Sequence, residues 1–318
     1  MDNKSKIEIQ GKIKKNKHAY LIIAHKDNDT LKSLIEMIDD AHNDIYLHMD
    51  KKNSSYNPSE IEKIVKKSNI FHTRRTNVKW GGYSLVNAEL ILFEMAASKG
   101  KYKYYHLISG EDLPLKSQEE IHDYFDKNGS KEYVGFFKES PETIENRYRK
   151  YHFFQEYIGR NSKSGLKDII LRKMEELCLK IQKIGGEKWK RNADIQFYKG
   201  SQWVSITDDF VRYILSNMKR IKKIYKYTII PDESFIQTIA MNSYYKNKLS
   251  TGNENEATMR LIDWERGNPY IYKKEDLLIL RNCDSLFARK FSDLVDKEII
   301  IELKKNVISK DSEGSEND

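Results

Sequence analysis

The sequence predicts an α/β fold in which helices cover both faces of a mostly parallel sheet. Between residues 18 and 127, short apolar runs alternate with segments whose apolar residues recur every three or four positions. The apolar runs end in polar residues, as expected where the carboxyl ends of parallel strands face a ligand. Because parallel strands must be joined by a crossover, this alternation favours a parallel sheet over a series of hairpins.

The expected strands are short runs of β-branched and aromatic residues bounded by polar ones. They lie within "HAYLIIAHKDND" (18–29), "DIYLHMDKK" (44–52), "NIFHT" (69–73) and "YKYYHLISGEDLPL" (102–115). The helices are expected from apolar spacing and from end signals: Pro58 in a first turn, Gly100 after a last turn, and Ser117 with Glu120 as a capping box. They span 30–40, 58–67, 83–100 and 118–127.

The second half of the chain is less regular. The stretch "FYKGSQWVSITDDFVRYIL" (197–215) indicates a turn, a strand and a helix capped by Thr207. In "YTIIPDESFIQTIAM" (227–241), an apolar β-like run leads into Asp232 and Glu233, which open a helix-like run. No glycine- and serine-rich linker divides the chain. We therefore expect a basic segment at 1–17, one domain at 18–300 with halves at 18–130 and 131–300, and a polar, disordered tail at 301–318.

Composition restricts the kinds of partner. The 318 residues include 56 basic and 48 acidic side chains, a net charge of +8 that favours anionic partners such as a nucleotide or a phospholipid surface. No apolar run approaches the roughly 18 residues of a membrane helix. The N-terminus has no apolar stretch after its charges, so we expect no signal peptide and a cytoplasmic location. Cys178 shares a helical face with Met174, Leu177 and Ile181, which predicts a buried thiol.

Two acidic motifs each allow a structural and a chemical interpretation. Asp232 and Glu233 could cap a helix, or one of them could be a catalytic base. Asp27 and Asp29 form an Asp-x-Asp pair before a helix, and an N-cap with an Asx turn is favoured over a metal site. The histidines are dispersed, so the sequence predicts no structural metal site.

The glycine spacing argues against an ordinary dinucleotide-binding fold and excludes a P-loop. No G-x-G-x-x-G follows the first strand, and no P-loop motif is present. "KWGGYS" (79–84) places two adjacent glycines before a helix, where their backbone amides could approach a phosphate or a base, or form a plain turn. Basic residues also occur among aromatic residues in "RYRKYHFF" (147–154) and "LFARKFSD" (286–293).

Seven segments in order resemble the core-2/I-branching enzymes, glycosyltransferase family 14, which also contains peptide O-xylosyltransferases. The segments are "IIAHKDN", "IYLHMDKK", "VKWGGYSLVNAEL", "YYHLISGEDLPLKS", "KGSQWVSIT", "IIPDESFIQTI" and "SLFARKFSD", which cover about residues 18 to 295. The short chain resembles the bacterial branch of that family.

The resemblance implies a GT-A fold whose first half binds a nucleotide-sugar and whose second half binds the acceptor and the phosphates. It implies inverting transfer of a sugar from a UDP-sugar to a hydroxyl of a glycan. The expected sugar is N-acetylglucosamine, and xylose is the other sugar with a precedent in the family. It also implies that no metal or other cofactor is needed. For a bacterial-type enzyme we expect a lipid-linked oligosaccharide acceptor for a surface polysaccharide, and contact with the inner face of an anionic membrane.

The same resemblance assigns roles to residues. Glu233 matches the general base. The residues implied on the donor side are His25, Asp50, Trp80, Gly81, Gly82, Asp112, Arg289 and Lys290. Those implied on the acceptor side are Arg147, Arg149, Lys150, Gly200, Ser201, Gln202, Trp203 and Asp232, with Asp232 also as a helix cap. A second phosphate-binding arginine of the family has no counterpart in register within 266–276, where Lys273 and Lys274 are candidates.

Three alternatives stay open. The chain could be a metal-dependent GT-A glycosyltransferase with another donor, using Asp27 and Asp29. It could bind a nucleotide-sugar without catalysis. It could also bind nucleic acid through its basic and aromatic clusters, although no recognised motif for nucleic acid is present and we expect no such partner.

Overall fold

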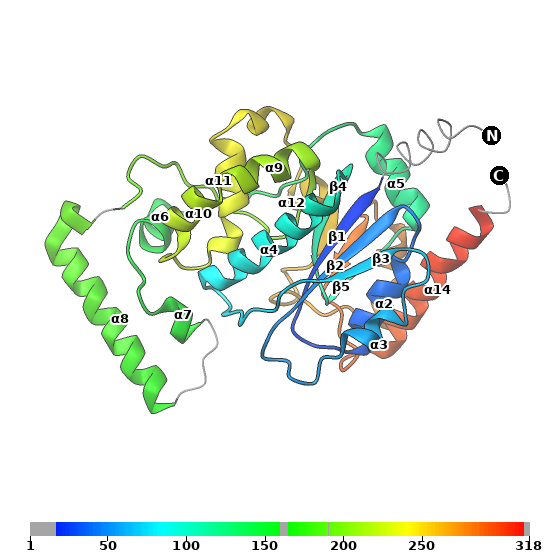
Figure 1. The fold of residues 1–318 in the computed structure, drawn as a ribbon, viewed down its shortest axis with the longest axis horizontal. Coiled ribbons are helices and arrows are strands. Elements are labelled where there is room, and N and C mark those ends of the chain that lie inside the picture. Colours follow the sequence, from blue (N-terminus) through cyan, green and yellow to red (C-terminus); the bar gives the residue numbers. More distant parts are fainter. Residues whose placement is uncertain (1–16, 160–164, 190, 315–318) are drawn as a thin grey trace.

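The computed structural model describes residues 17–159, 165–189 and 191–314, so most of the predicted basic segment at 1–17 lies outside them. Figure 1 shows a sheet with helices on both sides and one long helix, α8, at one end of the molecule. The strands are β1 (His18–Ala24), β2 (Asn43–Met49), β3 (Asn69–His72), β4 (Tyr104–Ser109), β5 (Asp112–Pro114), β6 (Ser205–Thr207), β7 (Arg260–Ile262) and β8 (Phe287–Arg289).

The α-helices are α2 (Asp29–Met37), α3 (Pro58–Glu62), α4 (Tyr83–Lys99), α5 (Gln118–Lys127), α6 (Pro141–Tyr148), α7 (Gln155–Ile158), α8 (Leu166–Gly185), α9 (Asp208–Ser216), α10 (Met218–Tyr225), α11 (Phe235–Met241), α12 (Glu254–Thr258), α13 (Leu277–Asn282) and α14 (Lys297–Gly314). The short 3-10 helices are η1 (Gly186–Trp189), η2 (Pro231–Glu233), η3 (Tyr244–Lys248) and η4 (Lys274–Asp276).

The central sheet has the strand order β3-β2-β1-β4-β6. Its first four strands are parallel, and β6 pairs with β4 in the antiparallel direction. The predicted α/β class with a mostly parallel sheet is therefore confirmed, and the arrangement agrees with the expected GT-A fold. In a parallel sheet the carboxyl ends of the strands meet at one edge, which makes that edge the natural place for a ligand.

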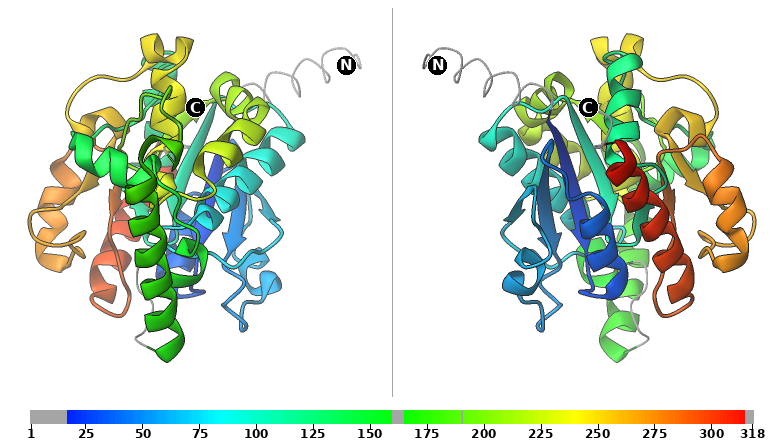
Figure 2. Two further views of the ribbon diagram at one scale, coloured as in Figure 1. Left: turned by 90° about the vertical axis from the view of Figure 1, so that its left-hand side faces the viewer. Right: turned by 90° about the vertical axis from the view of Figure 1, so that its right-hand side faces the viewer.

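Strands β1, β2 and β4 send alternate side chains to two separate cores. On β1, Tyr20 and Ile22 join a cluster that includes residues of α2, α5 and α14. Ala19 and Leu21 join the other cluster, with residues of α4, α9, α10 and α11. Figure 2 shows α2 and α14 side by side on the face of the sheet opposite α4. The period-two alternation of a strand thus produces two helical layers, one on each face.

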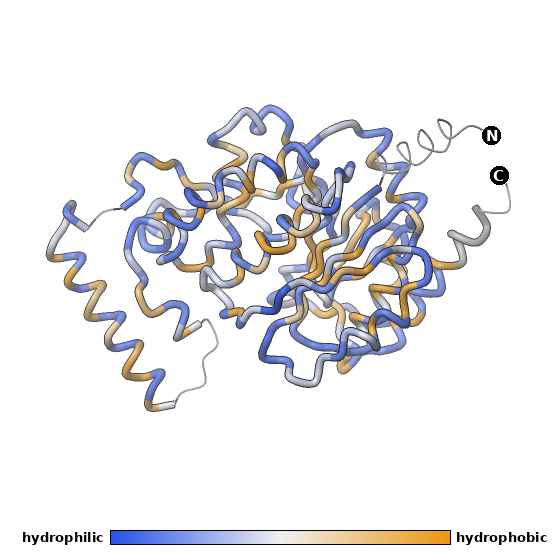
Figure 3. The backbone as a smooth tube through the Cα atoms, viewed as in Figure 1, coloured by the Kyte–Doolittle hydropathy of each residue, from blue (hydrophilic) through white to orange (hydrophobic). Residues whose placement is uncertain are grey.

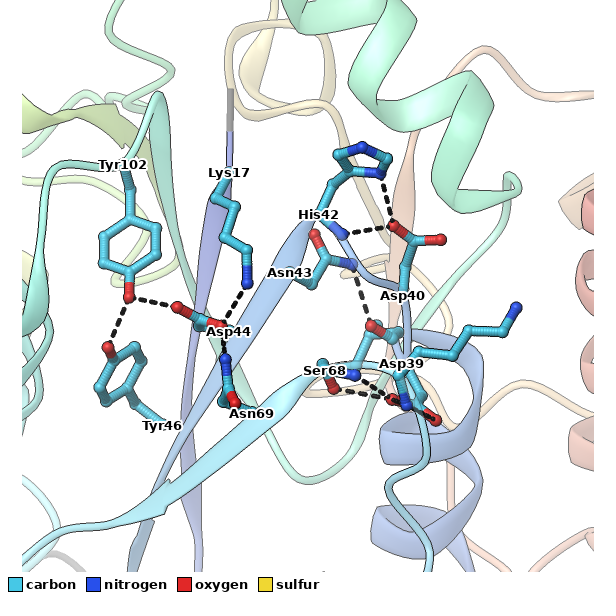
Figure 4. A network of polar contacts seen from close by, with 12 residues as sticks. Lys17, Asp39, Asp40, His42, Asn43, Asp44, Tyr46, Ser68, Asn69 and Tyr102 are labelled. Atoms are coloured by element: carbon cyan, nitrogen blue, oxygen red, sulfur yellow. Dashed lines mark hydrogen bonds and ion pairs between the residues drawn. The ribbon is translucent and has the colours of Figure 1, made fainter. Parts of the chain in front are cut away.

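The amino edge of the sheet is closed by polar contacts (Figure 4). The Asp44 carboxylate accepts hydrogen bonds from Lys17 at 2.9 Å, Asn69 at 2.8 Å and Tyr102 at 2.6 Å. The Asp39 carboxylate accepts from the backbone amides of residues 66–68. These contacts tie the beginnings of β1, β2 and β3 to the adjoining loops.

A second sheet, with strand order β5-β8-β7, lies beside the first and is joined to it by the buried Arg260. The Arg260 guanidinium donates to the carbonyl oxygens of Thr258 (2.6 Å) and Val204 (2.7 Å), and to the Ser205 hydroxyl (3.1 Å). It also lies over the ring of Phe287, 5.3 Å from its centroid. Burial lowers the pKa of Arg260 to about 10, which still leaves it charged at neutral pH.

Several predicted helix ends are confirmed. Ser117 and Glu120 form the capping box of α5, and the Thr207 side chain accepts from the Phe210 amide at the start of α9. At α2 the cap is Asn28, whose side chain accepts from the Leu31 amide. Asp29 lies in the first turn and pairs with Lys297, so the asparagine between the two aspartates is the capping residue.

Three expectations were wrong. Residues 227–230 form a turn rather than a strand, and Ile230 has left-handed backbone angles. The tail expected to be disordered from 301 continues helix α14 to 314, because Leu303 and Val307 pack in the core with α2 and α5. Cys178 is only partly buried, since the apolar residues next to it on α8 face outwards.

Among the helices of the described residues, none is both long and apolar enough to cross a bilayer.

We predict that Arg260→Lys lowers the free energy of unfolding by about 3–5 kcal/mol, because a single ammonium cannot replace a planar guanidinium among three separate acceptors. Chemical denaturation measures the change. Arg220→Lys, at an exposed position on α10, is the matched control and should change stability by less than about 0.5 kcal/mol. Equal stability of the two variants would mean that Arg260 does not hold the sheets together.

Candidate functional site

Charged side chains gather at the carboxyl edge of the sheet. Asp50 follows β2, and its carboxylate accepts from the backbone amide of Lys52 at 2.9 Å and pairs with the Lys52 ammonium at 3.1 Å. Lys290 pairs with Glu111 at 3.0 Å. His25, after β1, lies within electrostatic reach of Glu111, Lys290 and Asp50. Three predicted donor-side residues from distant parts of the sequence therefore meet at one edge.

Arg289 lies next to this group on β8. Its guanidinium donates to the Ser109 hydroxyl at 2.9 Å and pairs with Asp112 at 3.0 Å. The same guanidinium lies 4.7 Å from the centroid of the Trp203 ring. The pairing of β5 with β8 sets this geometry, because Asp112 is the register partner of Arg289. Two adjacent cations, Arg289 and Lys290, are thus held where parallel strands end, a suitable arrangement for a diphosphate.

The W-G-G turn contacts the segment that carries Glu233. The carbonyl oxygen of Gly81 accepts from the Ile230 amide at 2.9 Å. Gly81 has a φ of 81°, which favours glycine at this position. Trp80 is about half exposed, so its ring is available at the surface beside the turn. The two segments lie about 150 residues apart in sequence, and this hydrogen bond fixes one against the other.

Glu233 lies in η2 with its side chain between two cations. Its Oε2 atom is 3.6 Å from the Arg147 guanidinium and 3.6 Å from the Lys199 ammonium. Lys199 also pairs with Glu139 at 3.0 Å. The Glu233 carboxylate is partly exposed, so it can reach a substrate while the cations orient it.

Close backbone packing at Gly200 holds the same turn. The Gly200 amide donates to the Glu233 carbonyl oxygen at 2.8 Å. A β-carbon on Gly200 would lie 1.8 Å from the carbonyl oxygen of Gly135, which is impossible without moving the backbone. The absence of a side chain at Gly200 therefore lets three chain segments meet behind the Glu233 carboxylate.

Asp232 does not cap helix α11, because the N-cap position belongs to Ser234. The predicted capping role is therefore wrong. Asp232 is instead buried beside Glu89 of α4. The Gln202 amide donates to Glu89 at 2.6 Å. Burial raises the pKa of Glu89 well above its ordinary value, and the negative charge of Asp232 adds to the effect, so Glu89 favours the neutral form. A buried polar cluster thus links α4 to the Glu233 turn.

A further carboxyl group, Glu254 at the start of α12, lies close to Glu233. Burial raises the pKa of Glu254 to about 7. The negative charge of Glu233 adds to this rise, while a hydrogen bond with Trp264 and the charge of Lys199 oppose it. Glu254 therefore changes protonation near neutral pH within the same group of side chains.

The acceptor-side residues are not all brought together. Arg147 reaches Glu233, but Arg149 donates to the carbonyl oxygens of Asn192 (2.9 Å) and Ile195 (3.0 Å) and holds the local backbone. The Lys150 ammonium donates to the side-chain oxygen of Asn146 at 2.5 Å. The Ser201 hydroxyl accepts from the Trp203 amide at 3.3 Å. The roles of these residues in acceptor binding stay predictions.

Sequence reasoning missed several residues of the site: Glu89, Glu111, Glu139, Lys199 and Glu254. Glu111 and Lys199 stand directly beside predicted residues, so their position was an available signal. Glu89 lies inside the "VKWGGYSLVNAEL" motif, where an acidic residue on an otherwise apolar helix face was a signal too. Glu139 lies in a loop and Glu254 in the short helix α12. No local sequence pattern indicates that either residue comes near Glu233.

Of the Asp27 and Asp29 pair, Asp29 opens α2 and pairs with Lys297, whereas the buried Oδ1 atom of Asp27 has no hydrogen-bond partner among the described residues. Lys274 of the unaligned 266–276 stretch pairs with Glu298 at 2.7 Å. In that stretch, Arg266 pairs with Asp263 at 2.5 Å and with Asp276 at 2.7 Å. Within the described residues, no group of three or more His, Cys, Asp or Glu side chains could hold a metal ion.

Comparison with known proteins identifies a family. A family model described as Core-2/I-Branching enzyme matches residues 18–279. Xylosyltransferase 2 of Canis lupus familiaris is 24% identical over 303 residues, which cover 89% of this chain and 32% of that protein. Xylosyltransferase oxt of Drosophila melanogaster is 25% identical over 281 residues, covering 81% of this chain and 30% of that protein. The chain thus spans about a third of the length of these relatives.

A solved structure, 4-diphosphocytidyl-2C-methyl-D-erythritol synthase from Anaerococcus prevotii, is similar with a TM-score of 0.34 and 10% identity. The match covers 85% of this chain and 97% of that one.

We predict that Glu254→Gln changes how stability depends on pH. In the unfolded chain Glu254 loses its proton near pH 4.5, but in the folded protein it keeps the proton until about pH 7. Its contribution to the free energy of unfolding therefore falls as pH rises through this interval, and the variant lacks that fall. The melting temperature of Glu254→Gln, relative to the natural protein, should rise between pH 5 and pH 8.

Glu265→Gln, at an exposed position, is the control and should keep a constant difference from the natural protein across the same range. Parallel pH curves for Glu254→Gln and the natural protein would rule out a raised pKa at Glu254.

Proposed function

Because the chain belongs to the core-2/I-branching enzyme family, we propose that it transfers a sugar from a UDP-sugar to a hydroxyl group of a glycan, with inversion at the anomeric carbon and with Glu233 as general base. The observation that supports the proposal is a series of contacts between the two groups. Arg289, next to Lys290, lies over the ring of Trp203; the neighbouring Gln202 donates to Glu89; and Glu89 lies beside Asp232, which precedes the partly exposed Glu233.

The reaction needs one base and one group that stabilises the leaving diphosphate. Glu233 takes the proton of the acceptor hydroxyl while that oxygen forms a bond to the anomeric carbon. The bond between the anomeric carbon and the phosphate oxygen breaks, and UDP leaves with the electron pair. Arg289 and Lys290 supply positive charge to that oxygen and its phosphates. Arg147 and Lys199 orient the carboxylate.

The cations at the diphosphate have acidic partners, Asp112 and Glu111. A diphosphate carries more negative charge than one carboxylate, so it can take over these contacts when it binds. On this basis we propose that the reaction does not need a divalent metal. The rival is a metal-dependent transferase of the same fold with another donor.

The substrates are proposed from the family. The resemblance to core-2/I-branching enzymes supports N-acetylglucosamine as the donor sugar, and the names of the curated relatives support xylose. As acceptor we propose a glycan or lipid-linked oligosaccharide used for a bacterial surface polysaccharide, with the enzyme at the cytoplasmic face of the membrane.

We predict that Glu233→Gln lowers the rate of transfer by about 100-fold or more and leaves UDP affinity unchanged, because the amide cannot accept the proton but keeps the shape of the side chain. Transfer of radiolabelled sugar and calorimetric titration with UDP measure the two quantities. Glu142→Gln, on the exposed first turn of α6, is the matched control and should retain full activity.

If Glu233→Gln still turned over at the natural rate, Glu233 would not be the base. Loss of UDP binding in that variant would instead indicate a structural fault.

We also predict that UDP raises the melting temperature in the presence of EDTA, since a ligand that binds the folded state stabilises it. A thermal-shift panel should compare UDP, GDP and CMP, with UDP-N-acetylglucosamine and UDP-xylose to choose the donor.

Lys290→Gln should weaken UDP binding by about tenfold, the effect of losing roughly 1.4 kcal/mol. Lys305→Gln, on the exposed part of α14, is the control.

A shift that needs manganese would favour the metal-dependent alternative. No shift with any nucleotide would remove the nucleotide-sugar proposal and leave nucleic-acid binding to be tested by salt-dependent retention on an immobilised duplex.

A further inference from the structure

Helix α8 carries an exposed stripe of apolar side chains, here called the apolar stripe. Its members recur at spacings of three and four, so they lie on one side of the helix over its whole length. They are between 44% and 87% exposed. The members are Leu166, Ile170, Met174, Leu177, Ile181 and Ile184. Figure 3 shows hydrophobic residues along α8, and Figure 1 shows this helix at one end of the molecule. Its 20 residues, at a rise of 1.5 Å each, make it about 30 Å long.

The opposite side of α8 is held to the body by polar contacts. Gln182 donates to the Tyr151 carbonyl oxygen and accepts from the Tyr151 amide, both at 2.8 Å. Glu175 contacts the His152 ring at 2.8 Å and accepts from the Phe154 amide at 3.1 Å. Because these contacts fix the orientation of the helix, the apolar stripe is presented outwards.

A cleft of about 590 Å³ adjoins α8 at Tyr151, and we call it the basic cleft. Its lining includes no acidic residue and is Tyr151, Arg191, Asn192, Lys219, Lys222, Lys223, Lys226 and Tyr227. The Arg191 guanidinium donates to the backbone carbonyl oxygens of Lys223 (2.8 Å) and Ile224 (2.6 Å). The four lysines are exposed, and within the described residues none forms an ion pair with an acidic side chain.

Aromatic side chains lie beside the basic cleft, near the carboxyl end of α8. Tyr151 stacks on Phe153 with centroids 5.4 Å apart, and it meets Trp189 edge-on at 6.4 Å. Trp189 is 40% exposed and directly follows α8 through η1. Phe153 and Tyr157 are exposed as well. Tryptophan and tyrosine favour the boundary between apolar chains and polar headgroups.

We propose that the apolar stripe of α8 and the basic cleft together form a docking surface for an anionic lipid bilayer. An amphipathic helix that is too polar to span a membrane lies in the plane of the interface, with its apolar side among the acyl chains. Lys173 and Lys180 border the stripe, and the lysines of the basic cleft are positioned to contact acidic headgroups. Each lysine near an anionic surface adds to the attraction.

Charge complementarity favours a bilayer over a second copy of the chain as the occupant. A twofold contact through α8 would place two copies of the same lysine-rich surface at one interface, and like charges repel. An anionic bilayer supplies both an apolar layer for the stripe and negative charge for the lysines.

The docking surface does not depend on the proposed transfer reaction. Its residues are separate from Glu233, Arg289 and Lys290, and the test below uses no nucleotide-sugar. A failed docking test therefore leaves the transferase proposal intact, and the reverse also holds.

The test is sedimentation of the full-length protein with vesicles of phosphatidylcholine alone or of phosphatidylcholine with phosphatidylglycerol. We expect binding to the anionic vesicles only, and weaker binding at high salt, because screening reduces attraction between exposed charges. Leu177→Glu with Ile181→Glu should weaken binding by tenfold or more, and Lys222→Glu with Lys226→Glu should do the same.

The matched controls are changes of the same kind elsewhere on the surface. Leu278→Glu replaces an exposed leucine on α13, and Lys66→Glu replaces an exposed lysine near α3. Both should bind vesicles as the natural protein does.

Tryptophan fluorescence gives a second readout. A blue shift on adding anionic vesicles should disappear in Trp189→Phe. Equal sedimentation of the α8 variants and the natural protein would overturn the proposal. So would a dimer in solution that Leu177→Glu with Ile181→Glu dissociates, because the apolar stripe would then be an interface between copies.

Discussion

The buried guanidinium of Arg260 is the interaction on which the relation between the two sheets depends. It binds carbonyl oxygens that precede β7 and β6 and lies over Phe287 of β8, so one side chain joins the central sheet to the second one. A buried charge needs hydrogen bonds to offset its lost hydration, and here three close acceptors bind the two terminal nitrogens, while Nε has no hydrogen-bond partner. The position of Arg289, two residues beyond Phe287, therefore follows from the packing of Arg260.

The proposed chemistry needs groups on separate elements to stay in fixed positions. The two cations lie at the end of β8, while Glu233, the proposed base, lies in η2. Trp203 contacts Arg289, and the neighbouring Gln202 donates to Glu89, which lies beside Asp232 in the Glu233 turn. Such precision comes from rigid, fully packed surroundings. Close backbone packing at Gly200 supplies this behind Glu233, since no other residue leaves room there.

Helix α8 shows how an amphipathic pattern can mislead. Its apolar spacing predicts a buried face around Cys178, because most amphipathic helices pack that face on a core. In the structure the contacts of Gln182 and Glu175 bind the polar side of the helix to residues 151–154. The pattern predicted the helix. The direction of its apolar side depended on the hydrogen bonds between its polar side and residues 151–154, which the pattern does not reveal.

The sequence by itself determined most elements of the parallel sheet and the motif residues. Local periodicity and end signals predict the parallel sheet, its helices and the caps at Ser117 and Thr207, because these depend on neighbours within a few residues. Resemblance to a family pointed to Glu233, Arg289 and Lys290. Only the tertiary structure decided the contacts of Glu254 with this group, the turn at residues 227–230 and the outward face of α8. Those features result from long-range packing, which leaves no periodic signal along the chain.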